Sequence, residues 1–287
     1  VRTPGNAFRL PEKVLNEEVD RILNLGVNAH FNHYVKNLKE ISDKGYDAIF
    51  VGTGAPRGRD LPDVPGRTEG DADIFLGIEW LAAVLYRHVI EAPPKVLVLG
   101  GGNTAMDCCR MAKRLGGEDV KVIVRSPRSE MKASPWEIED AEAEDIPIIE
   151  NHSPLEFVLK DGNLVGMNFQ KVAPTYDKDG NRKLIPTDEA PVFIPCDQVL
   201  LAVGQQNAYP FIDADSGIEM DKWGMPKVDE TTFQSTAPNI FFGGDAAFGP
   251  KNVITAVAHG HEAAISIDLF CQDKDLYDRP LPGTILS

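Results

Sequence analysis

The stretch "VLVLGGGNTAMDCCR" at residues 96–110 constrains the fold more than any other part of this 287-residue chain. Apolar residues run directly into three glycines, and a helix-forming segment follows. A short apolar run that ends at glycines is typical of a buried strand. After the paired glycines 116–117 comes "VKVIV" at 120–124, a second strand pattern. The sequence therefore predicts a βαβ unit of about thirty residues with a right-handed crossover.

The glycines between the expected strand and helix form a dinucleotide-binding pattern. Gly100 and Gly102, with Ala105 in the third place, give G-x-G-x-x-A. Glycines let the backbone approach a pyrophosphate, and the helix N-terminus adds the positive end of its dipole. We expect Gly100, Gly102, Asn103 and Thr104 to bind a dinucleotide. A purely structural turn is the alternative interpretation.

The end of the second strand indicates which dinucleotide binds. An NAD site usually places an acid there to hold the ribose 2′-hydroxyl. This strand instead ends in "VIVRSPRSEMK", with Arg125 at the expected position of the acid and Arg128 after it. Arginines suit a 2′-phosphate, because they donate charge-assisted, bidentate hydrogen bonds. A solvated helix face explains the neighbouring basic residues but not these two, so the sequence predicts NADP(H).

The composition narrows the choice of partner and compartment. The net charge of -15 argues against binding to nucleic acid or to an anionic membrane surface. No apolar run approaches the roughly 20 residues that span a bilayer. The four cysteines form no disulfide framework, and the adjacent Cys108 and Cys109 diverge by about 100° on a helix. We interpret these two cysteines as packing residues and expect a cytoplasmic protein.

Periodicity predicts the remaining elements. Helices are expected within 11–40, at 73–90 and at 252–270, and further strands at 46–55, 146–150, 198–205 and 239–246. A small antiparallel meander is expected over 155–195, where turns at "DGN" and "DKDGN" separate apolar runs.

Several motifs together resemble one family. "GGGNTAMD" with the arginine-rich strand end, "AVGQ", and the tail "GGDAAFGPKNVITAVAHGHEAA" are similar to the small (beta) subunit of glutamate synthase and related NADPH-dependent flavoprotein oxidoreductases. These belong to the wider pyridine-nucleotide–disulfide-oxidoreductase-like superfamily. "FRLP" (8–11), "AIFVGTGA" (48–55) and "PGR" (65–67) occur in the family's order, so the resemblance covers nearly the whole chain.

The resemblance implies the domain organisation. The fold would be α/β with two Rossmann-like domains. An NADP(H)-binding domain at 93–205 would be inserted into an FAD domain made of 1–92 and 206–287. The small antiparallel meander would belong to the inserted domain.

The resemblance also implies flavin contacts. Asp245 would bind the ribityl chain of FAD, and the helix start at Val253–Thr255 would face the pyrimidine end of the flavin. A helix N-terminus stabilises the negative charge of reduced flavin, which agrees with this placement. The residues implied to hold FAD are Gly54, Gly204, Gln205, Gly244, Asp245, Val253, Ile254 and Thr255. For Asp245, a turn or N-cap role is the alternative.

Two features of the family are missing from the sequence. Its first G-x-G-x-x-G, which binds the FAD pyrophosphate, is absent, and so are the iron–sulfur cysteines that relatives often carry. "FRLP" normally follows that fingerprint, yet here it stands at residue 8. We therefore expect an incomplete FAD site in the C-terminal part of a longer protein, or one that another chain completes. Residues 1–45 should pack poorly unless a partner completes the sheet.

These expectations combine into one function. Hydride would pass from NADPH to FAD, and electrons would go on to an iron–sulfur protein or subunit, with a hetero-oligomer as one arrangement. No residue is assigned as a catalytic acid or base or as a metal ligand, because hydride transfer needs placement more than proton chemistry. The tail helix residues His259 and His261 are expected to be packed or exposed. The alternative is a non-catalytic nucleotide-binding fragment or electron-transfer subunit; a simple Rossmann dehydrogenase leaves 239–270 unexplained.

Overall fold

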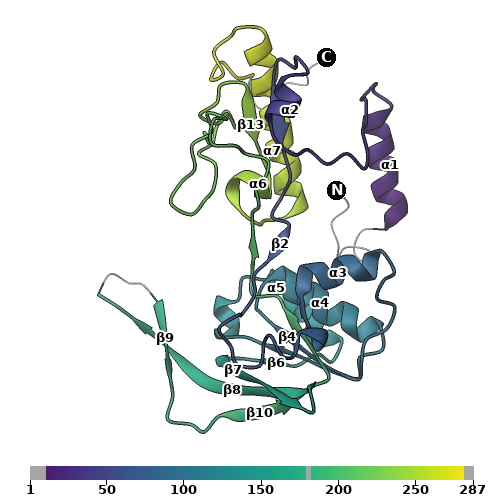
Figure 1. Ribbon diagram of the computed structural model, residues 1–287, viewed down its shortest axis with the longest axis vertical. Helices are drawn as coiled ribbons and strands as arrows, with labels where there is room; N and C mark the ends of the chain where they lie inside the picture. The colour runs from purple at the N-terminus through teal and green to yellow at the C-terminus, as the bar shows by residue number, and fades with distance from the viewer. Residues whose placement is uncertain (1–10, 179–181, 281–287) are drawn as a thin grey trace. The chain divides into compact units, whose positions relative to one another are not determined.

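The computed structural model describes residues 11–178 and 182–280 (Figure 1). Most of the "FRLP" motif, residues 8–10, lies outside the described residues, as do residues 1–7 of the N-terminal segment expected to pack poorly. The described chain divides into two compact units. Unit 1 contains 11–26 and 58–205 without the undescribed gap, and unit 2 contains 27–57 and 206–280.

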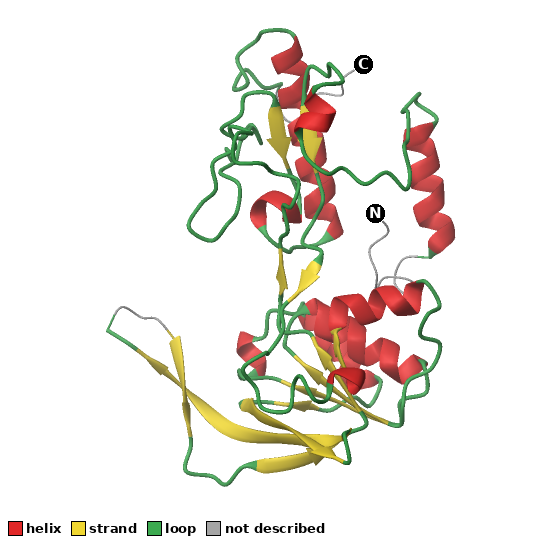
Figure 2. Ribbon diagram, in the orientation of Figure 1, coloured by secondary structure: helices red, strands yellow, loops and turns green. Residues whose placement is uncertain are grey.

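A five-stranded parallel sheet forms the centre of unit 1, in the order β3-β11-β4-β5-β6. Figure 2 draws the strands in yellow and the helices in red. Its strands are β3 (Ile74–Leu76), β4 (Lys95–Leu99), β5 (Asp119–Ile123), β6 (Ile148–Ile149) and β11 (Gln198–Leu201). The helices of this unit are α3 (Gly77–Leu85), α4 (Asn103–Arg114) and α5 (Pro135–Ala143), with short 3₁₀ turns η1 (Asp71–Asp73) and η2 (Arg128–Glu130). The expected βαβ unit is β4, α4 and β5.

Both faces of this sheet are covered, which explains why its strands are continuously apolar. Alternate residues of a strand point to opposite faces. In β4, Val96 and Val98 belong to the core that contains α3 and α4, whereas Leu97 and Leu99 pack in a second core with the antiparallel strands.

The antiparallel strands confirm the expected meander. They are β7 (His152–Lys160), β8 (Asn163–Tyr176), β9 (Arg182–Pro186) and β10 (Val192–Pro195), and β8 pairs with each of the others. The turn between β7 and β8 is Asp161-Gly162, with φ of 53° and 81°. Two positive φ values at an Asp-Gly pair fit a tight hairpin, which fixes the register of β7 on β8.

The region before residue 92 differs from the expectation. The prediction of one helix over 73–90 was wrong for Ile74–Leu76, which forms β3 and pairs in parallel with β11. The apolar run continues without a break into α3, so periodicity alone did not separate strand from helix. As a result residues 58–92 lie in the same compact unit as the glycine turn, whereas the resemblance grouped them with 206–287.

Unit 2 is built around two parallel strands, β1 (Ile49–Val51) and β13 (Ile240–Phe242). Its helices are α2 (Lys39–Ser42), α6 (Asp245–Phe248) and α7 (Val253–Cys271). The core of this unit includes Leu38, Ile49 and Phe242. Outside these cores, β2 (Arg57–Gly58) and β12 (Gln205–Gln206) form a two-stranded sheet of their own. Helix α1 (Glu12–Leu23) buries none of its residues among the described part of the chain.

Helices α4 and α5 are joined by a largely buried ion-pair network. The Arg110 guanidinium, 10% exposed, lies 3.2 Å from Glu137, 2.9 Å from Asp140 and 2.8 Å from Glu144. Arg114 adds a second contact to Glu144 at 2.6 Å. Two of the basic residues near the glycine turn are therefore neutralised by α5, and they fasten that helix to α4.

We expect Arg110→Ala to lower the free energy of unfolding of unit 1 by about 3 kcal/mol, because it removes the cation that three carboxylates share, one of them the buried Glu137. Lys113→Ala is the matched control, since Lys113 donates only to the Glu118 backbone carbonyl at an exposed position. This control should change stability by less than about 0.5 kcal/mol. Urea unfolding at neutral pH measures both variants.

The same network gives stability a defined acid dependence. Hydrogen bonds from Arg114 and then Arg110 outweigh burial and hold the pKa of Glu144 at about 2, below its ordinary 4.5. Because the folded pKa is the lower one, the stabilisation is complete above about pH 4.5 and is lost as the pH falls towards 2. In Arg110→Ala, the free energy of unfolding should fall less steeply as the pH is lowered below 4.5. A fall as steep as in the wild type would contradict this role of the Glu144 network.

Candidate functional site

The glycine turn after β4 is tight on one side and open on the other. Gly100 has φ +142°, and a Cβ there would lie 2.1 Å from the Ala202 carbonyl oxygen, so no other residue fits. At Gly102 a Cβ would meet no described atom within 4 Å. No side chain of the described residues caps the first turn of α4. An uncapped helix start beside open space is the arrangement that binds a phosphate group.

The segment that follows β5 folds back onto this turn. We call residues 125–134 the arginine loop. The backbone N–H groups of Lys132 and Ala133 both donate to the Gly101 carbonyl at 2.9 Å. The Ser134 N–H donates to Asn103 Oδ1 at 2.8 Å. The structure thus brings the predicted turn and the predicted arginines together at one end of β4 and β5.

The two predicted arginines are in different electrostatic states. Arg125 is exposed, and its guanidinium has no hydrogen-bond or ion-pair partner within the described part of the chain. Arg128 instead forms an ion pair with Glu142 of α5, and its backbone N–H donates to Glu150 Oε2 at 2.6 Å. Arg125 is thus unpaired among the described residues, whereas Arg128 is paired with a carboxylate.

Two further predicted residues lie beside the start of α4. Gln205 Nε2 donates to Thr104 Oγ1 at 3.4 Å. Gly204, at φ +126°, accepts a 3.0 Å hydrogen bond from the Arg59 N–H. The resemblance implied flavin contacts for Gly204 and Gln205, and the structure places both next to the glycine turn of unit 1.

In unit 2 the other predicted residues gather at one end of β1 and β13. These strands are parallel, with Val51 opposite Phe242, so the glycines that follow each strand leave the same end of the pair. Gly54, in the first of these turns, has φ +74° and open space at its Cβ position. Gly244, in the second, has φ +60°, and a Cβ there would lie 3.3 Å from Ala256 of α7.

Asp245 follows this second turn in a partly buried position. Its Oδ1 accepts the Lys251 N–H at 3.0 Å. Burial raises the pKa of Asp245, and the hydrogen bond from Lys251 opposes that shift. Part of the carboxylate is thus occupied by its own loop, as the turn interpretation expects.

His259 supports the Gly244 turn. Its Nδ1 accepts the Gly244 N–H at 3.1 Å, which puts the ring proton on Nε2. The ring packs against Phe233 and Phe248 at centroid distances of 5.2 and 4.9 Å. Burial lowers the pKa of His259, so the neutral ring is favoured. His259 is therefore a packed helix residue and His261 an exposed one, both within the expectation of packed or exposed side chains.

The start of α7 is partly used by its own cap. Asn252 Oδ1 accepts both the Thr255 N–H and the Thr255 hydroxyl at 2.8 Å. Val253 and Ile254 are 51% and 81% exposed, so they present apolar surface there. The helix end implied for the flavin therefore offers fewer free N–H groups than α4 does.

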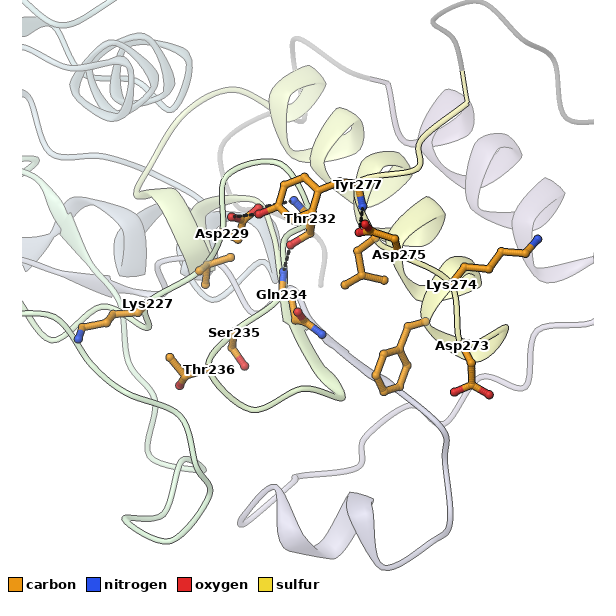
Figure 3. Close-up of a pocket in the computed structure, with 13 residues that line it drawn as sticks. Lys227, Asp229, Thr232, Gln234, Ser235, Thr236, Asp273, Lys274, Asp275 and Tyr277 are labelled. Carbon is orange, nitrogen blue, oxygen red and sulfur yellow. Dashed lines mark hydrogen bonds between the residues drawn. The ribbon is translucent and has the colours of Figure 1, made fainter.

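A cavity of about 640 Å³ in unit 2 lies at none of these positions (Figure 3). A hydrogen bond of 2.8 Å from the Tyr277 hydroxyl to Asp229 Oδ2 spans part of its wall. That bond raises the pKa of Tyr277. The described lining includes no residue that the sequence predicted to bind a cofactor.

The cysteines carry no redox pair. Cys108 and Cys109 are free and buried, as expected for packing residues. Burial raises the pKa of Cys109 to about 12, so its thiol stays protonated and inert. Among residues 11–178 and 182–280, no group of three His, Cys, Asp or Glu side chains is arranged to hold a metal ion. None of the described helices has the length and hydrophobicity to cross a membrane.

Comparison with known proteins identifies the family. Residues 5–260 match the family described as pyridine nucleotide-disulphide oxidoreductase. The chain belongs to this family. The expected superfamily and two-domain α/β fold are confirmed, and the cofactors of the family are NADP(H) and FAD.

Relatives and solved structures agree with this membership. The chain is 35% identical over 268 residues to the NADP(+)-dependent formate dehydrogenase subunit beta of Moorella thermoacetica, covering 92% of this chain and 38% of the relative. It is 28% identical to the NADPH-Fe(3+) oxidoreductase subunit beta of Geobacter sulfurreducens, covering 94% and 44%. The chain thus spans less than half the length of these two relatives.

Two solved structures share the fold. FprA of Mycobacterium tuberculosis in complex with NADPH gives a TM-score of 0.69 at 15% identity, covering 92% of this chain and 72% of that one. Thioredoxin reductase of T. acidophilum gives 0.59 at 21% identity, covering 79% and 66%. At these identities the likeness concerns the fold alone.

The two cofactors fit the described residues unequally. Unit 1 offers what a pyrophosphate needs, a strand, an open glycine turn and a twelve-residue uncapped helix. In unit 2 the glycines after β1 lead into β2, and those after β13 lead into α6, which has only four residues. Unit 2 therefore fits the flavin end of FAD better than its pyrophosphate.

The sequence analysis did not predict the role of Gly101 and Ser134, whose backbone groups anchor the arginine loop. The signal for Ser134 was local, because "SPWE" at 134–137 is a helix start with Ser before a proline. No local pattern indicated that its N–H would bond Asn103, 31 residues earlier.

Two glycine variants separate folding from binding at the turn. Gly102→Ala should leave stability within about 0.5 kcal/mol, since its Cβ enters open space at φ -104°. It should weaken NADPH binding by about tenfold or more, because that space is where a phosphate approaches. Gly100→Ala should instead destabilise unit 1 by about 3 kcal/mol or more. Thermal unfolding and nucleotide titration test both; unchanged NADPH affinity in Gly102→Ala would contradict this site.

Proposed function

We propose that this chain is the NADPH-oxidising module of a flavoprotein electron-transfer enzyme. Unit 1 binds NADP(H) at the glycine turn, and the arginine loop selects the phosphorylated cofactor. Unit 2 holds the flavin end of FAD. When bound, FAD supplies the hydride acceptor and the chemistry that separates a hydride into single electrons.

One observation carries the proposal. An exposed Arg125 with no partner among the described residues lies on the loop that is hydrogen-bonded to an open, uncapped glycine turn. Although the chain has a net charge of -15, no carboxylate of the described residues pairs with this guanidinium. The ligand that suits both features is a dinucleotide with an additional phosphate on its ribose.

The residues of this chain would act by binding and placement. The N–H groups at Gly102, Asn103 and Thr104 would hold the pyrophosphate, and Arg125 with Arg128 would hold the 2′-phosphate. In unit 2, Asp245 would accept a hydrogen bond from a ribityl hydroxyl. Gly54, Gly244 and the Val253–Thr255 turn would lie along the flavin. No side chain needs to move a proton for hydride transfer.

The relatives support a partner in a larger assembly. Those named above are beta subunits of a formate dehydrogenase and of an Fe(3+) oxidoreductase, both NADP-dependent by name. By analogy we propose that electrons pass to an iron–sulfur protein or subunit within a cytoplasmic hetero-oligomer. The narrower likeness to glutamate synthase is part of the same proposal.

A second candidate is a nucleotide-binding subunit without a complete flavin site of its own. It is favoured by the two-stranded sheet of unit 2 and by the four-residue α6, because among the described residues of unit 2 no long helix directly follows a strand and its glycine turn to hold the FAD pyrophosphate. The absorbance spectrum of the purified chain discriminates the two. Bound flavin after gel filtration supports the complete site, and a colourless chain that binds NADPH supports the second candidate.

We expect the wild-type chain to bind NADPH more tightly than NADH. Arg125→Ala should remove about 2 kcal/mol of that preference, since it deletes a charge-assisted contact. Arg128→Ala should remove less, about 1 kcal/mol, because Arg128 already pairs with Glu142. Lys121→Ala is the control, since Lys121 pairs with Asp119 on β5. Titration with both nucleotides measures the preference, and equal wild-type affinities would refute NADP(H) selection.

A further inference from the structure

Asn103 links the starts of two helices in unit 1. It is the first residue of α4, and its Oδ1 accepts the N–H of Ser134, the N-cap residue of α5, at 2.8 Å. A side-chain oxygen that accepts this bond is directed at the protein's own backbone. The same oxygen would be repelled by a pyrophosphate, which offers only acceptors. Its position therefore suggests a role toward the arginine loop.

The arginine loop has further anchors of both backbone and side-chain type; among the latter, the Arg128 guanidinium pairs with Glu142, and Glu130 accepts a hydrogen bond from the Tyr176 hydroxyl at 3.4 Å. Gly101 O accepts from the N–H groups of Lys132 and Ala133, and Arg128 N–H donates to Glu150. Met131 also packs here, with its Cγ 3.3 Å from the position of a Cβ on Gly101. Asn103 is thus the side chain through which the α4 start holds the far end of the loop, close to the open space at Gly102.

We infer that Asn103 is a positioning residue for cofactor selection. It holds the arginine loop in the place where Arg125 meets the 2′-phosphate, and it acts through the Ser134 N–H. This inference rests on the proposed function, because it concerns how the same site tells NADPH from NADH.

A positioning role and a direct pyrophosphate contact of Asn103 predict different effects on the affinities for NADPH and NADH. Both nucleotides carry the pyrophosphate, so a residue that contacts it contributes equally to NADPH and NADH. A residue that positions Arg125 contributes only where a 2′-phosphate is present. The ratio of the two affinities therefore reports the role of Asn103, and a general loss of packing would leave that ratio unchanged.

The experiment removes each partner of the bond in the full chain. Asn103→Ala deletes the acceptor. Ser134→Pro deletes the N–H donor at φ -60°, an angle that proline adopts. Each change should lower the NADPH preference about fivefold, the effect of one ordinary hydrogen bond, with little change for NADH. The double variant should lose no more than either single variant, because both remove one interaction.

The decisive comparison measures the effect of Asn103→Ala in a chain that already carries Arg125→Ala. Without that guanidinium, Asn103→Ala should lower the preference by clearly less than fivefold, because only the share that Arg128 contributes is left to lose. This cycle keeps the inference testable even if Ser134→Pro fails to fold. Equal weakening of both nucleotides by Asn103→Ala, or an unchanged preference, would overturn the positioning role. A wild-type chain with no preference would instead refute the proposed function itself, so the two failures are distinguishable.

Discussion

The close approach of Gly100 to the Ala202 carbonyl determines where the glycine turn lies. β4 is flanked by β11 and β5, and the parallel register places Leu99 opposite Leu201 on one side and Ile123 on the other. The chain must then turn within one residue, at a φ that favours glycine. Because Gly100 makes that turn against the residue that follows β11, α4 begins three residues later, at Asn103. The arginine loop can then bond the Gly101 carbonyl between them.

The arginines in this region differ in whether a carboxylate pairs with them, which their number in the sequence does not reveal. Arg110 and Arg114 of α4 pair with Glu144, the C-cap residue of α5, and thereby hold α5 against α4, whereas Arg128 of the arginine loop pairs with Glu142 of α5. Arg125 is left exposed without such a partner in the described chain. A basic patch counted along the sequence therefore contains three structural arginines and one that remains available for a ligand.

Local patterns predicted the elements whose signals are local. The strand, glycines and helix at 96–115 and the hairpin at Asp161-Gly162 follow from residue type and period alone. The strand β3 was hidden inside a longer apolar run, because its pairing with β11 joins segments more than a hundred residues apart. The Arg128–Glu142 and Asn103–Ser134 contacts were out of reach for the same reason. Their partners lie 14 and 31 residues away and meet only when α5 packs on α4.

The central claim is that NADP(H) binds to the turn and the arginine loop of unit 1. Amide hydrogen exchange with and without saturating NADP⁺ tests this claim directly, because bound backbone groups exchange more slowly. We predict protection at residues 101–106 and 125–134, and none at 52–55 or 243–246. Protection confined to unit 2, or no protection at the glycine turn, would contradict the account.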